Sequence, residues 1–387
     1  MKNKILQAQE NTLRTLDKAK PTILVAAGGT AGHVNPALSI ARKIMKYRPD
    51  WQIVFCGNGN RMEYDLISQT EFPFYWVEAA KFSKNIIELA KNMTTNYRGY
   101  RQARKLIDEL NVVGAIGAGG YVTFPVITAA KNRKIPSFLH EQNAHSGLSN
   151  RSLSKDADIV FISYEATRED FPKAHEVVFS GNPVSDEFYE ITYESARASL
   201  NLTDDEFYIL VTGGSLGAAT LNKLTLGLAQ DFSSREDLGN YNIHLVAGKN
   251  NYEEISSELA AVENVKVSDY IYNMPEEMAA SDLVICRAGA GTCAELQVLE
   301  KPSILLPYPY ATADHQTKNA QALVDVGAAY MFQDDELELN EIIDLIKGLM
   351  ADRNKLDTMQ ENLSKLATKN SAELIADAIL GKLGVEN

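Results

Sequence analysis

The chain alternates short apolar runs with longer segments in which apolar residues recur at helical spacing. Such runs predict buried strands, and the first half contains six of them: Ile23–Ala27, Gln52–Cys56, Phe74–Val77, Val113–Ile116, Ser137–His140 and Ile159–Ile162. The second half repeats the pattern with Tyr208–Thr212, Ile243–Ala247, Val265–Ser268, Leu283–Cys286 and Ser303–Pro307. Strands that alternate with helices are typical of doubly wound sheets. The pattern predicts an α/β protein with two Rossmann-like domains whose parallel sheets face a cleft.

The length also supports two domains, because 387 residues exceed what one hydrophobic core usually holds. A polar N-terminal extension is expected at residues 1–20. The first domain is placed at 21–184 and the second at 201–365, with a charged helical linker at 185–200. A C-terminal helix is expected at 366–387.

A glycine-rich turn follows the first strand of each predicted domain. Gly28-Gly-Thr-Ala-Gly-His33 leads into a helix from about Pro36, and Gly213-Gly-Ser-Leu-Gly-Ala218 leads into one from about Leu221. Glycine lets the backbone approach a ligand, and a helix N-terminus attracts an anion. The dinucleotide pattern with its acidic residue and the G-x-x-x-x-G-K-[ST] loop of ATPases are both missing. The turns therefore favour phosphate binding but not NAD, FAD or ATP.

A third glycine-rich turn carries a carboxylate. It runs from Arg287 to Glu295 after the strand Leu283–Cys286, and Glu295 could accept two hydrogen bonds from a ribose diol. The alternative is a glutamate that only interacts with the helix dipole. Downstream, Asp314-His-Gln-Thr-Lys-Asn-Ala320 gathers polar groups after a strand end, where α/β folds bind ligands.

Composition excludes several classes of function. A formal charge of −13 argues against a nucleic-acid binder. The three cysteines fit no CxxC metal or redox pattern, which indicates reduced thiols in a cytosolic chain. His140 and His145 are five positions apart, which does not fit a zinc protease helix. Asp156-Ala-Asp158 precedes a strand instead of ending one, so a solvated helix end is favoured over a metal site.

One basic stretch contrasts with the acidic average. Between Lys81 and Lys105, seven Lys and Arg residues stand against Glu88 alone, with apolar and aromatic residues between them. This pattern suits an interfacial helix on an anionic membrane, and it also suits an amphipathic helix docked on the sheet with its cations in water. No apolar run is long enough to span a membrane, and the N-terminus lacks the apolar core of a signal peptide.

These motifs together resemble the MurG family of peptidoglycan glycosyltransferases. Two of the matching stretches are the glycine-rich turns at 28–33 and 213–218. The others are Gly117-Ala-Gly-Gly-Tyr121, His140-Glu-Gln-Asn143, Gly181-Asn-Pro-Val184, Cys286-Arg-Ala-Gly-Ala290 and Asp314-His-Gln316 with Asn319-Ala320. They occur in the family's order between about residues 22 and 332. The chain departs from the family at Ala31, Leu216, Ala288 and Ser185, where glycine, glutamine, serine and arginine are common.

The resemblance implies a two-domain fold of the GT-B type and an inverting hexosyltransferase. The enzyme would move N-acetylglucosamine from UDP-N-acetylglucosamine to undecaprenyl-diphospho-muramoyl-pentapeptide, in a step of cell wall biogenesis on which cell shape and division depend. It would need no cofactor and no metal. Two alternatives stay open, a UDP-sugar epimerase of the same architecture and an inactive UDP-sugar-binding homologue.

The resemblance also implies roles for particular residues. His33 is the first candidate for the catalytic base and Glu141 the second. The expected substrate-binding residues are Thr30, Ala31, Gly32, Asn143, Ser185, Ser215, Ile271, Ala290, Gly291, Thr292, Glu295 and Gln316. Peripheral attachment to the cytoplasmic side of the cell membrane, an anionic surface, is expected through Lys81, Phe82, Lys84, Ile86, Lys91 and Arg98. Cell-wall synthesis proteins are further possible partners.

Overall fold

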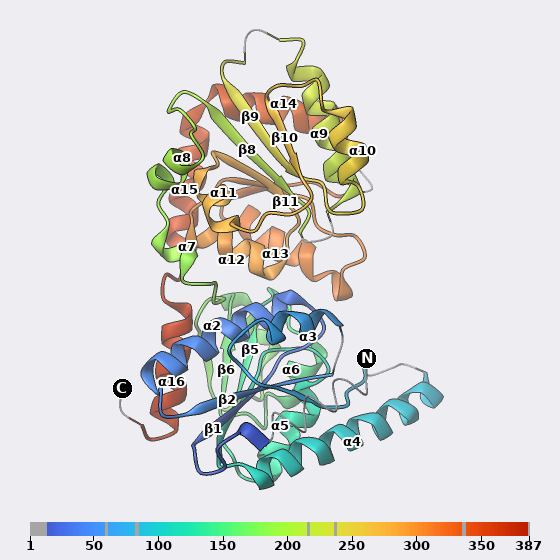
Figure 1. Cartoon of the computed structure of the whole chain (residues 1–387), viewed down its shortest axis with the longest axis vertical. Helices are drawn as coiled ribbons and strands as arrows, with labels where there is room; N and C mark the ends of the chain where they lie inside the picture. Colours follow the sequence, from blue (N-terminus) through green and yellow to red (C-terminus); the bar gives the residue numbers. More distant parts are fainter. Residues whose placement is uncertain are drawn as a thin grey trace. The chain divides into compact units, whose positions relative to one another are not determined.

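The computed structural model describes residues 14–58, 61–81, 85–214, 217–235, 238–334 and 338–385, apart from the side chains of Arg61 and Ile86. Most of the predicted extension, residues 1–13, lies outside the described residues. The chain forms two compact units, of which the first comprises residues 1–185 and 370–387 and the second residues 186–369. Each unit contains one parallel sheet with helices on its faces (Figure 1).

The first unit has a seven-stranded sheet in the order β3-β2-β1-β4-β5-β6-β7. Its strands are β1 (Thr22–Ala26), β2 (Gln52–Gly57), β3 (Phe74–Trp76), β4 (Val112–Gly117), β5 (Ser137–Glu141), β6 (Ile159–Ile162) and β7 (Val177–Phe179). Its helices are α2 (Ala31–Tyr47), α3 (Arg61–Ser68), α4 (Ile86–Glu109), α5 (Thr123–Asn132), α6 (Leu148–Leu153), the 3-10 turn η1 (Glu165–Asp170) and α16 (Ser371–Lys382). The order places β1 beside β4, so the carboxyl end of β1 opens at the point where the strand order reverses.

Alternate residues of β1 serve opposite faces of this sheet. Ile23 and Val25 pack with α2, α3 and α16, whereas Leu24 and Ala26 pack with α4, α5 and α6. Because β1 is buried on both faces, its sequence is apolar from Ile23 to Ala26. The C-terminal helix α16 thus completes the core of the first unit, although it follows the second unit in the chain.

The second unit has a six-stranded sheet in the order β10-β9-β8-β11-β12-β13. Its strands are β8 (Phe207–Thr212), β9 (Tyr241–Val246), β10 (Val265–Ser268), β11 (Leu283–Cys286), β12 (Ser303–Leu305) and β13 (Ala329–Met331). Its helices are α7 (Glu187–Glu190), α8 (Tyr193–Ser199), α9 (Ala219–Phe232), α10 (Tyr252–Glu258), α11 (Met274–Ala280), α12 (Ala290–Val298), the 3-10 turn η2 (Thr312–Asp314), α13 (His315–Val324), α14 (Leu339–Ala351) and α15 (Arg353–Leu366). Helices α9, α10, α14 and α15 pack on one face, and α8 and α11 contribute to the other.

The structure departs from the sequence-based expectations at several boundaries. Helix α2 begins at Ala31, five residues before the expected start, because Pro36 fits within the helix and Thr30 takes the extended N-cap conformation. Helix α9 likewise begins at Ala219. Strands β7 and β13 were not expected. The predicted linker contains α7 and α8, which group with the second unit.

Candidate functional site

The first glycine turn places His33 in the first turn of α2. Its Nδ1 lies 2.8 Å from the carbonyl oxygen of Gly28, and 3.4 Å from the hydroxyl of Thr30. A carbonyl oxygen can only accept a hydrogen bond, so Nδ1 carries the proton in this contact. In the neutral imidazole, the ring lone pair is therefore on Nε2. The turn holds His33 in the tautomer that could take a proton at Nε2.

Two glycines lie shortly after β4, and Gly119 lies against the Cδ2–Nε2 edge of this imidazole. Gly119 and Gly120 have φ angles of +104° and +81°, which side-chain-bearing residues rarely adopt. A Cβ on Gly119 would lie 2.5 Å from Cδ2 of His33, and one on Gly120 would overlap the Gly28 carbonyl oxygen. The stretch Gly117-Ala-Gly-Gly-Tyr121 is thus needed for the close approach of the two loops.

A third part of this arrangement is Glu63, which the sequence analysis did not identify. This residue is 1% exposed. Its carboxylate accepts hydrogen bonds from the backbone N–H groups of Gly29, at 2.5 Å, and Asn58, at 2.6 Å. It therefore joins the loop after β1 to the loop after β2. No motif around Glu63 indicates a functional role. The one signal in the sequence was the glycine at position 57, which leaves room for the carboxylate.

Glu141 ends β5 and is buried with its carboxylate hydrogen-bonded. The backbone N–H of Gly147 and the side chain of Asn150 donate to Oε2, both at 2.9 Å. The backbone and side-chain amides of Asn143 donate to Oε1, both at 3.2 Å. Burial raises the pKa of Glu141, and these donors oppose that rise. Glu141 and Asn143 therefore lie together, and the carboxylate holds the loop after β5.

In the second unit, Glu295 lies on α12 within reach of the third glycine turn. Its Oε1 is 4.0 Å from the position of a Cβ on Gly291, so the carboxylate folds back along the helix towards its N-terminus. The loss of surrounding water raises the pKa of Glu295 to about 7. Ala290, Gly291 and Thr292 form the first turn of the same helix. The structure thus gathers four of the predicted donor-binding residues on one helix.

Gln316 lies at the start of α13 and contacts the loop after β12. Its Oε1 accepts a hydrogen bond from the backbone N–H of Tyr308 at 2.9 Å. Since a backbone N–H only donates, the amide oxygen must face it, and the NH2 group is left to donate to another acceptor. A phosphate or sugar oxygen would be such an acceptor. Ala313 and Asp314, just before α13, have φ angles of +53° and +54°, which cost non-glycine residues free energy.

Arg287 braces the turn that precedes α12. Its guanidinium donates to the carbonyl oxygens of Leu306 and Pro307 at 3.0 and 3.1 Å and pairs with Asp334 at 2.7 Å. Asn319 donates to the carbonyl oxygen of Ala288 at 3.2 Å. The motif residues Arg287 and Asn319 therefore shape this turn from both sides.

The remaining predicted substrate residues are spread more widely. Ile271 is buried. Ser185 is partly exposed at the last position of the first unit, while Ser215 lies outside the described residues.

The two aspartates of the Asp156-Ala-Asp158 stretch lie at the amino ends of the strands. Asp156 pairs with Lys131, and Asp158 accepts a hydrogen bond from the backbone N–H of Ser137 at 2.9 Å.

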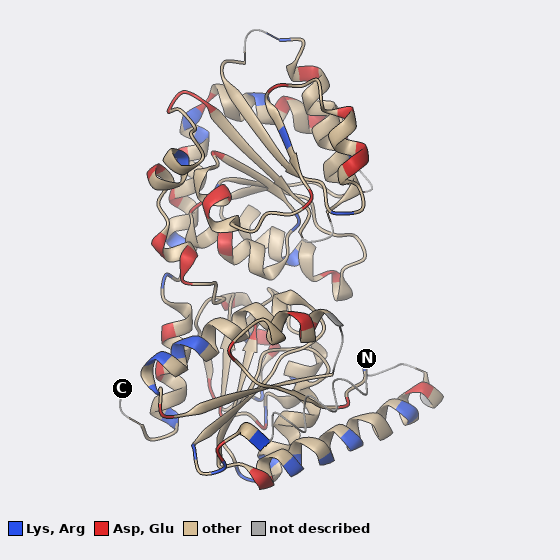
Figure 2. Cartoon of the chain, viewed as in Figure 1, with Lys and Arg blue, Asp and Glu red and all other residues tan. Residues whose placement is uncertain are grey.

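Residues 86–105 of the predicted membrane stretch belong to the long helix α4. Figure 2 shows its Lys and Arg positions at intervals along the helix. Phe82 and Lys84 lie outside the described residues, as does the side chain of Ile86. The large apolar residues of α4 that are exposed to solvent are instead Ile87, Met93 and Tyr97, which are 83%, 60% and 61% exposed. Sequence reasoning did not separate these residues from the buried ones.

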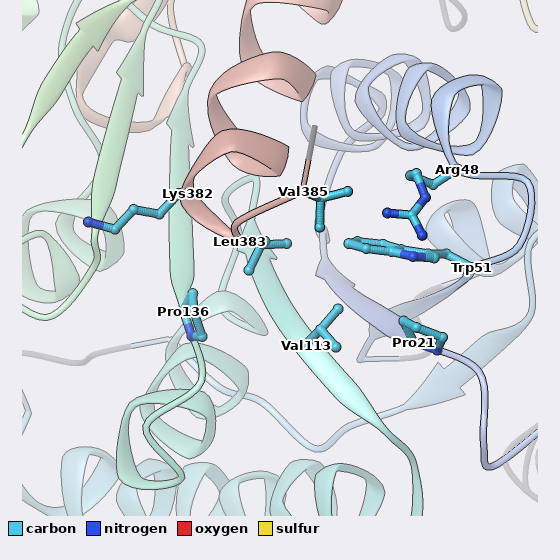
Figure 3. A pocket seen from close by; sticks show the side chains of 8 residues that line it. All are labelled: Pro21, Arg48, Trp51, Val113, Pro136, Lys382, Leu383 and Val385. Atoms are coloured by element: carbon cyan, nitrogen blue, oxygen red, sulfur yellow. The ribbon is translucent and has the colours of Figure 1, made fainter. Parts of the chain in front are cut away.

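A cavity at the opposite edge of the first sheet contains none of the predicted residues. It lies at the amino ends of the strands, and it is lined by Pro21, Arg48, Trp51, Val113, Pro136, Lys382, Leu383 and Val385 (Figure 3). Arg48 lies over the ring of Trp51, 4.6 Å from its centroid, and pairs with Asp50. This cavity is where the end of α16 meets the sheet.

Comparison with known proteins gives matches for both units. Residues 23–162 match the glycosyltransferase family 28 N-terminal domain, and residues 208–377 match the C-terminal domain of the same family. A relative from Acetivibrio thermocellus is 37% identical over 92% of this chain and 97% of its own length. It is named UDP-N-acetylglucosamine–N-acetylmuramyl-(pentapeptide) pyrophosphoryl-undecaprenol N-acetylglucosamine transferase.

Solved structures give the same result. A MurG of Acinetobacter baumannii aligns with a TM-score of 0.76 and 28% identity, over 94% of this chain and 99% of its own. A UDP-GlcNAc 2-epimerase from Neisseria meningitidis aligns with a TM-score of 0.64 over 93% and 100% of the two chains. At 17% identity, that likeness shows the shared fold alone. The extent and identity of the other matches place this chain in glycosyltransferase family 28, and within it in the MurG family of N-acetylglucosaminyltransferases.

Proposed function

We propose that this chain transfers N-acetylglucosamine from UDP-N-acetylglucosamine to the muramoyl-pentapeptide carried on undecaprenyl diphosphate. Membership of the MurG family supports the reaction, since the relatives are named for this transfer. The first unit would bind the lipid-linked acceptor and the second the UDP-sugar. An acceptor hydroxyl attacks the anomeric carbon, the bond from that carbon to the diphosphate oxygen breaks, and the configuration inverts.

The observation that carries the catalytic proposal is the contact between His33 and Gly28. With Nδ1 donating to the Gly28 carbonyl at 2.8 Å, Nε2 is the nitrogen that accepts the proton of the attacking hydroxyl. The N-terminus of α2 disfavours a positive charge nearby and so favours the neutral imidazole before reaction. Glu141, with both carboxylate oxygens occupied, is the weaker candidate for the base.

On the donor side, we propose that Glu295 accepts hydrogen bonds from the ribose diol. The N–H groups of Ala290, Gly291 and Thr292 at the start of α12 would face the diphosphate, whose charge grows as the bond breaks. The free amide NH2 of Gln316 would donate to a diphosphate or sugar oxygen. Contacts of the donor with Ser215, Ile271 and Ser185 remain predictions. Catalysis without a metal also remains a prediction.

We also propose that the first unit attaches peripherally to the cytoplasmic face of the cell membrane through α4. Lys91, Arg98, Arg101 and Lys105 fall within about 80° around this helix at 3.6 residues per turn, and all four are exposed. Ile87 lies within the same sector of the helix, Tyr97 lies about 40° beyond Arg101, and Met93 lies about 40° further round. Among the described residues, no helix is long and apolar enough to cross a membrane.

The experiment that tests the function is a transfer assay. Purified protein is incubated with labelled UDP-N-acetylglucosamine and the lipid-linked acceptor, and labelled disaccharide lipid is the expected product. His33→Ala is expected to lower kcat by about 10²–10⁴-fold while donor binding is retained. Formation of a UDP-sugar epimer without the acceptor would identify an epimerase instead, and donor binding with neither product would identify an inactive homologue.

A further inference from the structure

The peptide group between Gly28 and Gly29 makes two hydrogen bonds to side chains, one through its N–H and one through its carbonyl oxygen. Its N–H donates to Oε2 of Glu63 at 2.5 Å, and its carbonyl oxygen accepts from Nδ1 of His33 at 2.8 Å. The peptide group is planar and stiff, so the direction of its N–H fixes the direction of its carbonyl. One peptide plane therefore links a carboxylate to the imidazole of the proposed base.

The surroundings of Glu63 are built around its carboxylate. The other oxygen, Oε1, accepts a hydrogen bond from the N–H of Asn58 at 2.6 Å. A Cβ on Gly28 would lie 2.9 Å from Oε2, and one on Gly57 would lie 2.7 Å from Oε1. Both glycines leave space that any larger residue would take from the carboxylate. Burying a carboxylate is costly, so a site shaped to admit one calls for an explanation.

We propose that Glu63 is a positioning residue for His33 and acts through the Gly28–Gly29 peptide. The proposal rests on the role of His33 as the base. A carboxylate that accepts from the N–H polarises the peptide and makes its carbonyl a stronger acceptor. This holds the proton on Nδ1, keeps the lone pair on Nε2, and stabilises the imidazolium that forms when Nε2 takes the hydroxyl proton.

The charges near His33 agree with this role. The N-terminus of α2 opposes a positive imidazole, and the negative charge of Glu63 offsets it. A second titratable side chain near His33 is His140 of β5. Burial lowers the pKa of His140 to about 4, so His140 is neutral at neutral pH. The charge of Glu63 is therefore not cancelled by His140.

The test is Glu63→Gln, which keeps the shape of the side chain but offers one acceptor to two N–H donors. We expect the pKa of His33 to fall and its Nδ1–H tautomer to lose population, as followed by ¹⁵N NMR of the free protein between pH 4 and pH 9. The acidic limb of kcat/KM should move to lower pH, and kcat should fall roughly 10–100-fold, as when partners that orient a ligand are lost. Glu63→Asp withdraws the carboxylate by one methylene and should give a smaller change in the same direction.

Glu373→Gln is the matched control, because Glu373 accepts a hydrogen bond from Tyr47 at 2.7 Å at the other end of α2. It should leave the His33 titration and the pH profile unchanged. In a His33→Ala background, Glu63→Gln should cause no further loss of turnover. An unchanged His33 titration in whichever Glu63 variant folds overturns the positioning role. Full activity of His33→Ala overturns the base assignment instead, and the NMR titration separates the two results.

Discussion

Glu141 accepts a hydrogen bond from the side-chain amide of Asn150, with 2.9 Å between Oε2 and Nδ2. The backbone N–H of Gly147 donates to the same oxygen, and Asn143 donates twice to the other. The carboxylate thus links the loop after β5 to α6 by hydrogen bonds. A group held by four donors is suited to fixing a loop, whereas a base needs a lone pair directed at substrate.

We expect Glu141→Gln to lower the free energy of unfolding, because the glutamine NH2 would face buried N–H donors. Leaving one such donor unpaired costs about 1–3 kcal/mol. Urea unfolding measures the loss, and kcat per folded molecule should stay near the wild-type value. Glu165→Gln is the control, since Glu165 is exposed and pairs with Arg168 on the surface. Unchanged stability with a large loss of kcat would assign the base to Glu141.

Donor affinity should depend on pH through Glu295. Burial raises the pKa of this carboxyl to about 7, so it is largely protonated at pH 6 and largely ionised at pH 8. A ribose diol donates hydrogen bonds and prefers the ionised form. The affinity for UDP-N-acetylglucosamine should therefore rise with pH through about 7 and level off above it, as measured by calorimetry at pH 6, 7 and 8.

Substituting Glu295 tests the same contact. A hydrogen bond to a charged group contributes about 1.5–3 kcal/mol, so Glu295→Ala should weaken donor binding by roughly 10–100-fold at pH 8 and remove the pH dependence. Glu300→Ala, a surface carboxylate that pairs with Lys369 at 2.8 Å, is the control. Unchanged affinity in Glu295→Ala would remove the ribose assignment.

Gly119→Ala should disable the enzyme by displacing His33. The new Cβ would lie 2.5 Å from Cδ2 of His33, and the φ of +104° is strained for alanine. We expect lower stability and a large fall in kcat, with donor affinity unchanged. Gly348→Ala, on α14 with nothing within 4 Å of the new Cβ, should instead raise stability by about 1 kcal/mol. Normal turnover in Gly119→Ala would show that the close contact between Gly119 and His33 is not needed for catalysis.

Apolar runs made most of the strand cores predictable, but two short edge strands, β7 and β13, were not predicted. β6 was predicted with its observed bounds, because Ile159–Ile162 is apolar and buried throughout. β7 and β13 have three residues each at the edges of their sheets, and both are partly exposed. Three residues are too few to show a period, and the equally short edge strand β3 was predicted because the apolar run Phe74–Val77 extends beyond it.

The residues of the candidate site also differ in how far the sequence predicted them. His33 and Glu295 stand next to glycine turns that follow strands, so local sequence indicated them. Glu63 stands 34 residues after the N–H that it binds, in a helix with no motif of its own. Only the parallel pairing of β1 with β2 brings the two loops together. Contacts of this kind come from topology, and a single sequence does not reveal them.

Helix α4 presents both of the features that an interfacial helix needs. Some of its cations are partly neutralised on the protein surface, as in the pair of Arg98 with Glu78 at 3.8 Å. Lys91 and Arg101 have no ion-pair partner among the described residues. The overall charge of −13 repels an anionic membrane, so any attraction must be local and sensitive to salt.

Replacing Lys91, Arg98 and Arg101 by Glu should therefore release the protein from anionic vesicles. Each cation near the surface contributes about 1 kcal/mol, so the loss of three corresponds to roughly a hundredfold or more in binding. Co-sedimentation with vesicles at low and high salt measures it. The control replaces Lys355, Lys365 and Lys369, which are exposed in the second unit, with the same change in net charge. If both triple variants sediment equally, net charge governs the attraction and α4 is only a docked helix.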